Sequence, residues 1–195
     1  MSEQYEVLAV RYGTRQASAA EVFLNYHVYH EPDRPLGMDY FFWVARNPAR
    51  SVVIDTGFSP AGGTARGRTM LMDTVPALHA AGRLTLAGRT RQVAPGIELI
   101  QVGGHTPGQA IVTVATAGGP VVLASDAVHY FEELERDRPF SIVASLADMY
   151  AAFDQIRELA DDGARVVAGH DPLVAERFGH PADPPGVITI DQPAL

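Results

Sequence analysis

Short apolar runs recur along the chain and indicate a protein rich in β-strands. In the first half we expect four strands, each rich in β-branched or aromatic residues and bounded by glycine, proline or asparagine, at 5–12, 22–29, 40–46 and 51–55. Asn47-Pro48 is a turn signal, so the third and fourth strands are predicted to form a hairpin. Residues 31–37 hold two prolines and are predicted to be a loop.

The second half adds further strands and one strong helix. Strands are predicted at 84–86, 97–102, 111–115, 121–124 and 166–168, a loop at 56–69, a short helix at 70–81 and an irregular tail from Pro181. Apolar residues at helical spacing predict a helix from Leu146 to Ala160, with Ser145 as N-cap and Gly163 as the stop. Many strands with few helices predict two packed sheets with helices outside, in a single domain over 1–195.

Composition narrows the classes of function. The chain has 195 residues, of which 47% are hydrophobic and 19% charged, as in soluble globular proteins. A net charge of −8 argues against binding of nucleic acid or of an anionic membrane surface. The absence of lysine and cysteine excludes a Schiff-base lysine, a thiolate metal site and a disulfide framework. The first five residues lack the basic and apolar regions typical of a secretory signal, and no apolar run is as long as a membrane span, so we expect a cytoplasmic protein.

Two histidines and one aspartate stand where predicted strands end. His105 lies in Gly-Gly-His-Thr-Pro-Gly, Asp126 follows an apolar run, and His170 lies in Gly-His-Asp. If these strands are neighbours, the three side chains meet at one rim, and two imidazoles with a carboxylate suit a divalent metal ion. Adjacent glycines let the backbone turn sharply and approach a ligand closely. The alternative is that each histidine caps a turn through a backbone hydrogen bond.

Two other motifs point to different chemistry. Residues 62–69 differ by one residue from a phosphate-binding P-loop, but arginine replaces the lysine, so a glycine-rich surface loop is favoured. Asp55-Thr56-Gly57 matches the aspartic-protease triplet, which needs two such carboxylates, and the chain carries one copy. Only a homodimer would serve that reaction, and neither motif accounts for the histidines.

Three motifs in this order resemble the metallo-β-lactamase superfamily: Gly-Gly-His-Thr-Pro-Gly-Gln at 103–109, Leu-Ala-Ser-Asp-Ala at 123–127 and Val-Ala-Gly-His-Asp-Pro at 167–172. Residues 53–58 also resemble an early strand and turn of that family. The similarity is to the acyl-homoserine-lactonase-like branch. It implies an α+β fold, the αβ/βα sandwich, in which two mixed sheets lie face to face with helices on both outer sides.

The resemblance also implies roles for the site residues. His105 would bind a first zinc ion, Asp126 would bridge two ions and His170 would bind the second. The ions would lower the pKa of a shared water and polarise the carbonyl of a lactone or related acyl substrate. In some lactonases a tyrosine shortly after the bridging aspartate assists the substrate oxygen. Here His129 and Tyr130 follow at three and four residues; we take His129 as the catalytic candidate and leave the choice open.

The chain departs from the family at one motif. Relatives carry H-x-H-x-D-H before the segment of His105, whereas residues 58–96 contain one histidine, His79, so part of the N-terminal half is inferred to be missing near 70–74. Either the gene has lost this motif or the sequence omits a segment. We therefore expect one weakly bound zinc ion, or two if a segment is omitted, and slow or absent hydrolysis. The alternative is a non-catalytic remnant that binds a small molecule or forms a homodimer through exposed apolar surface.

Overall fold

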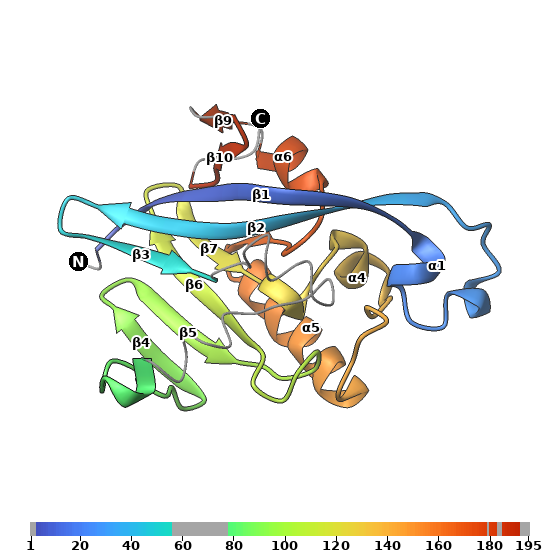
Figure 1. The fold of residues 1–195 in the computed structure, drawn as a ribbon, viewed down its shortest axis with the longest axis horizontal. Helices are drawn as coiled ribbons and strands as arrows, with labels where there is room; N and C mark the ends of the chain where they lie inside the picture. The colour runs from blue at the N-terminus through green and yellow to red at the C-terminus, as the bar shows by residue number, and fades with distance from the viewer. Residues whose placement is uncertain (1–2, 56–77, 179, 183–184, 192–195) are drawn as a thin grey trace.

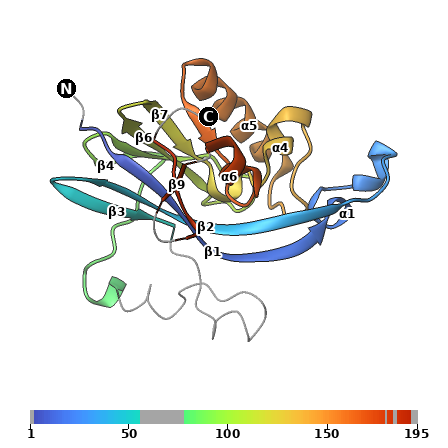
Figure 2. The same ribbon diagram turned by 90° about the horizontal axis from the view of Figure 1, so that it is seen from above.

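Two five-stranded sheets form the centre of the computed structural model, which describes residues 3–55, 78–178, 180–182 and 185–191 (Figure 1). The first sheet has the order β3-β2-β1-β10-β9 and the second the order β4-β5-β6-β7-β8. Seen from above, β1 and β2 lie on one side of the second sheet and α4 and α5 on its other side (Figure 2). The sheets therefore pack on one another, as the sequence predicts.

The first sheet is entirely antiparallel. Its strands are β1 (Glu6–Ser18), β2 (Pro35–Asn47), β3 (Arg50–Ile54), β9 (His180–Ala182) and β10 (Val187–Thr189). The predicted hairpin at Asn47 is confirmed, because β2 pairs with β3. The Asn47 side-chain oxygen accepts hydrogen bonds from the backbone N–H groups of Ala49 and Arg50 at 2.9 and 3.0 Å, which closes the turn.

The second sheet is antiparallel except for its last pair, β7 and β8, which run parallel. Its strands are β4 (Thr90–Ala94), β5 (Ile97–Gln101), β6 (Ala110–Thr116), β7 (Gly119–Leu123) and β8 (Arg165–Val167). A parallel pair needs a long crossover connection, and the residues between β7 and β8 supply it. That crossover carries Asp126 and two helices.

The helical elements are short apart from one. They are α1 (Ala19–Val22), η1 (Tyr26–Tyr29), η2 (Ser125–Ala127), α4 (Phe131–Arg136), α5 (Leu146–Asp161) and α6 (Leu173–Phe178). The helix predicted from Leu146 is confirmed as α5, and its predicted N-cap Ser145 accepts a hydrogen bond from the Asp148 N–H at 3.3 Å. Met149, Phe153 and Ile156 on α5 are fully buried in the main core. No helix in the described ranges is long and apolar enough to cross a membrane.

The strand predicted at 22–29 is wrong. This segment forms α1 and η1, at the end of the long β1–β2 ribbon that extends beyond the other strands (Figure 1). Its aromatic residues Phe23 and Tyr26 belong to a second buried cluster with Tyr130 and Phe140. Aromatic residues favour strands in general, but here they pack against residues 130–140. This tertiary packing, rather than intrinsic strand propensity, decides the local structure.

Three further predictions need correction. Residues 84–86 form no strand, and the Leu86 side chain is 80% exposed; the strand lies at β4 instead. Residues 35–37 of the predicted loop belong to β2. The tail predicted as irregular contains β9 and β10. Strand β10 pairs with the N-terminal half of β1, and this pairing with a distant segment is not visible in the local proline content.

Several predictions fall on residues outside the described ranges. These are the loop at 56–69, most of the helix at 70–81, the P-loop-like segment at 62–69, and the position near 70–74 where part of the fold was inferred to be missing. Residues 56–57 of the aspartic-protease triplet also lie outside, whereas Asp55 is described.

Candidate metal centre

Connections that follow three strands of the second sheet carry the predicted site residues. His105 follows β5, Asp126 lies in η2 after β7, and His170 follows β8. The last two segments are joined directly through the backbone: the Gly169 N–H donates to Val128 O at 2.8 Å, and the His170 N–H donates to His129 O at 3.0 Å. These two hydrogen bonds therefore hold the turn with His170 beside the start of the crossover, which carries Asp126 and His129.

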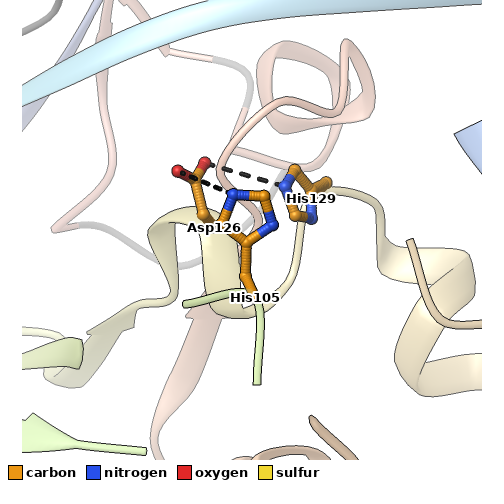
Figure 3. Close-up of side chains that lie close together, drawn as sticks. All are labelled: His105, Asp126 and His129. Atoms are coloured by element: carbon orange, nitrogen blue, oxygen red, sulfur yellow. Dashed lines mark ion pairs between the residues drawn. The ribbon is translucent and has the colours of Figure 1, made fainter. Parts of the chain in front are cut away.

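Three imidazoles face the carboxylate of Asp126. The His170 Nε2 lies 2.7 Å from Asp126 Oδ1, the His129 Nε2 3.8 Å from the same oxygen, and the His105 Nε2 3.9 Å from Asp126 Oδ2. Figure 3 shows His105 and His129 pointing toward the two carboxylate oxygens. The structure thus brings together the predicted trio and adds His129, which the sequence offered only as a candidate for catalysis.

One subset of these residues is especially compact. In the part of the chain that the structure describes, ligand atoms of His105, Asp126 and His129 all lie within 4.8 Å of one another. His170 stands outside this group, although it makes the shortest contact to Asp126. The compact trio therefore contains His129 where the resemblance implied His170.

The far nitrogen of each ring faces an acceptor of the protein. His105 Nδ1 lies 2.9 Å from the carbonyl oxygen of Ile142, and His170 Nδ1 lies 2.8 Å from the carbonyl oxygen of Asp39. A carbonyl oxygen only accepts, so Nδ1 carries the proton in both rings and Nε2 faces Asp126. Metal-binding histidines have the same orientation, in which the ring nitrogen away from the metal donates a hydrogen bond to a carbonyl or carboxylate oxygen.

His129 and Tyr130 point to different parts of the structure. His129 is buried, stacks on the Phe140 ring at 3.7 Å and directs Nε2 toward Asp126. Tyr130 points into the second cluster, where its hydroxyl donates to Gly37 O at 3.2 Å, and burial raises its pKa. Of these two side chains, His129 is the one in reach of the carboxylate.

The three histidines change the protonation of the centre. Burial alone would raise the pKa of Asp126, but the hydrogen bond from His170 and the charges of the histidines outweigh it and hold the pKa well below its usual range. Burial and then the neighbouring His129 lower the pKa of His105. Burial opposes the charged form of His170, but its hydrogen bond to Asp126 outweighs burial and raises the pKa. The surrounding rings therefore favour the ionised form of the Asp126 carboxylate, which is the form that binds a metal ion.

Glycines beside the histidines serve backbone packing. A Cβ at Gly169 would lie 2.4 Å from the carbonyl oxygen of Ser125, and one at Gly104, where φ is +95°, would lie 2.8 Å from Met149 Cα. The absence of a side chain lets the loop with His105 lie against α5 and the turn with His170 lie against the turn with Asp126. The glycines were expected to let the backbone approach a ligand closely. In the structure, they let it approach the backbone of neighbouring segments.

Asp55 reaches the same region from the first sheet. It follows β3 with φ of +61°, and its Oδ2 accepts a hydrogen bond from Ser125 Oγ at 3.1 Å. Tyr40 of β2 contacts the His170 ring edge-on, with ring centroids 5.2 Å apart. Both sheets therefore contribute residues around Asp126.

One residue of the site was missed in the sequence. Glu133 of α4 is fully buried, and its Oε1 lies 3.3 Å from His129 Nδ1. The available signal was a glutamate at the third position of a helix, where its side chain can accept hydrogen bonds from the backbone N–H groups just before the helix.

Comparison with known proteins supports the fold. No protein-family model matches the chain. An N-acyl homoserine lactonase from Bacillus sp. is 34% identical over 90 residues, which cover 46% of this chain and 32% of that lactonase. A hydrolase of the beta-lactamase superfamily, AbOPH, aligns at a TM-score of 0.68 and 13% identity over 97% of this chain and 95% of its own. The dizinc quorum-quenching lactonase AidC aligns at a TM-score of 0.65 and 14% identity, over 100% and 97%.

These similarities confirm the resemblance seen in the sequence at the level of fold and relatives. The chain has the two-sheet architecture of metallo-β-lactamase-like hydrolases, and its relatives in sequence and structure include lactonases. The matched part of the Bacillus lactonase is about a third of its length, so the activity of that whole protein is not carried over by the match.

Proposed function

We propose that this chain, which has the metallo-β-lactamase fold of its hydrolase neighbours, is a metal-dependent hydrolase of a lactone or related acyl substrate. The observation that carries the proposal is the convergence of three imidazoles on Asp126, each with Nε2 toward the carboxylate. A structural role for one histidine would not require the same ring orientation in all three.

The donor set fits a zinc ion. Two or three imidazoles with one carboxylate match the ligands of catalytic zinc sites, provided that the imidazoles lose their extra protons when the ion binds. His105 and Asp126 would hold the ion, together with His129 or His170. A bound zinc ion supplies Lewis-acid chemistry, which polarises an ester carbonyl and lowers the pKa of water. The remaining histidine then lies beside the reaction centre.

We propose one ion rather than two. A two-ion site needs further ligands, and the sequence contains no H-x-H motif to supply them. The expected consequence is weak zinc binding and slow hydrolysis. The same gap in the sequence is the observation that favours the alternative, a non-catalytic remnant of the fold.

The test combines zinc content with turnover. Purified protein is assayed for bound zinc and for hydrolysis of N-hexanoyl-L-homoserine lactone, first as wild type and then as Asp126→Asn. Because metal-assisted charge stabilisation is worth several kcal/mol, Asp126→Asn should lower kcat/KM at least about a hundredfold. Asp161→Asn, at the exposed end of α5, is the matched control and should change neither zinc content nor rate.

Each outcome distinguishes the proposals. Two tightly held ions per chain would contradict the single-ion site. Wild-type protein that holds no zinc and opens no lactone would favour the remnant. Equal rates for wild type and Asp126→Asn would refute the assignment of this centre.

A further inference from the structure

Glu133 stands behind His129 in a position that the proposed reaction does not use. Its side chain is completely buried at the first turn of α4, and His129 is only 2% exposed. Charged residues are almost never fully buried without a partner, so the position calls for an explanation.

The contacts of Glu133 are directed at the segment that carries His129. Its Oε1 accepts hydrogen bonds from the backbone N–H groups of His129 at 2.8 Å and Tyr130 at 2.9 Å. The same oxygen lies 3.3 Å from His129 Nδ1, within ion-pair range but without the geometry of a hydrogen bond. Within the described residues, His129 Nδ1 and Glu133 Oε2 are both buried and have no hydrogen-bond partner.

The other two rings of the centre show what this contact does. His105 and His170 each turn Nδ1 toward a carbonyl oxygen and Nε2 toward Asp126. The His129 ring has the same orientation, with Nε2 toward Asp126 and Nδ1 3.3 Å from the Glu133 carboxyl oxygen, although this last contact is not a hydrogen bond. An acceptor at Nδ1 favours the tautomer in which Nδ1 carries the proton and Nε2 keeps its lone pair.

We propose that Glu133 is a positioning residue that holds His129 in its Nδ1–H tautomer, so that His129 presents Nε2 as a ligand atom beside His105 and Asp126. The stacking of the ring on Phe140, with 12° between the planes, fixes its plane, and Glu133 fixes which nitrogen points inward. The role of His129 as a zinc ligand rests on the proposed function, whereas the assignment of its tautomer does not.

The first measurement uses the metal-free protein. Nitrogen-15 NMR of the ring nitrogens, at about pH 8 and thus above the ordinary imidazole pKa, reports the tautomer of each histidine. The signals of His129 are identified by their loss in His129→Gln. Wild type should show His129 with the proton on Nδ1. A proton on Nε2 in wild type would overturn the proposal.

Two variants separate the contact of Glu133 with the His129 ring from its hydrogen bonds to the backbone N–H groups at the start of α4. Glu133→Ala removes both, and its His129 should shift toward the Nε2–H tautomer. Glu133→Gln keeps an oxygen for the two backbone N–H groups but loses the charge, so it should fold and show a smaller shift in the same direction. If Glu133→Ala fails to fold, Glu133→Gln decides. Glu135→Ala, on the same helix with its carboxylate paired to Arg177, is the control and should leave the His129 signals unchanged.

Zinc affinity completes the test. Loss of an outer-shell partner typically weakens metal binding ten- to a hundredfold, so Glu133→Ala should bind zinc about that much more weakly than Glu135→Ala in a chelator competition. If wild type binds no zinc, the proposed function fails while the tautomer still decides the role of Glu133. If zinc binds equally to wild type and to both Glu133 variants, with the tautomer unchanged, the positioning role is refuted and the proposed function stands.

Discussion

Gly104→Ala should destabilise the protein through the contact between the His105 loop and α5. Gly104 has φ of +95°, and an added Cβ would lie 2.8, 3.0 and 3.1 Å from Cα, Cβ and N of Met149. Met149 is fully buried in α5, so its backbone has little room to move. The Gly104 carbonyl also accepts hydrogen bonds from Ala144 at 2.9 Å and Ser145 at 3.0 Å, which tie the loop to the start of the helix.

The magnitude follows from two effects. A non-glycine residue in a sparsely populated backbone region costs about 1–3 kcal/mol. Overpacking against a fixed neighbour costs about 1–3 kcal/mol more. The restriction of the unfolded chain by alanine offsets about 0.4–1 kcal/mol of this. The free energy of unfolding of Gly104→Ala should therefore fall by about 1–6 kcal/mol.

Urea denaturation of matched variants measures the effect. Gly108→Ala is the control, because it makes the same substitution in the same loop, where an added Cβ meets no atom of the described residues within 4 Å. The control should stay within about 0.5 kcal/mol of wild type. Zinc affinity should fall in Gly104→Ala as well, since His105 follows directly. Equal stability of the two variants would refute the argument that this glycine is required by the packing of α5.

Two further predictions concern other contacts. In Gly169→Ala the added Cβ would lie 2.4 Å from Ser125 O. We therefore expect urea denaturation to show a free energy of unfolding lower by about 1–3 kcal/mol, together with weaker zinc binding. If the variant bound zinc as tightly as wild type, the two turns could separate without cost to the site. The hydrogen bond from Arg138, and then the charges around it, lower the pKa of Glu31 to about 2, below its unfolded value. The ionised Glu31 therefore stabilises the fold above about pH 4.3, its pKa in the unfolded chain. This stabilisation is lost as the pH falls toward the lower pKa of Glu31 in the folded protein. Thermal melts of Glu31→Gln should differ from wild type at neutral pH and converge with it near pH 2; a constant difference would contradict this sign.

The sequence carried more information about the site than about the elements far from it. His105, Asp126 and His170 each follow an apolar run, and these runs become the strands β5, β7 and β8, whose ends are fixed by the sheet. Helix α5 was also predictable, since its stripe and the Ser145 cap are local signals. An element can be predicted from the sequence when its own residues carry the hydrophobic pattern and the capping signals that define it.

Other elements depend on partners far away in the chain. Phe23 and Tyr26 have the composition of a strand but pack against Tyr130 and Phe140. The edge strand β4 is mostly exposed, so it lacks the alternation that marks a strand with one buried face. Strand β10 pairs with β1 across most of the length of the chain. In each case the deciding contact is non-local, and periodicity in the sequence does not report it.

Buried polar groups provide an energetic argument between the two functions. A buried polar atom without a hydrogen bond costs about 1–3 kcal/mol, and within the described residues His129 Nδ1 and Glu133 Oε2 are two such atoms. A remnant kept only as a scaffold would gain stability if an apolar ring replaced the His129 imidazole, whereas Glu133 is also needed as the acceptor of two backbone N–H groups. In a metal centre the imidazole is a ligand, so the cost of its unpaired nitrogen is offset by a function. The single replacement His129→Phe should therefore raise the free energy of unfolding while weakening zinc binding, and a scaffold-only role predicts the first change without the second.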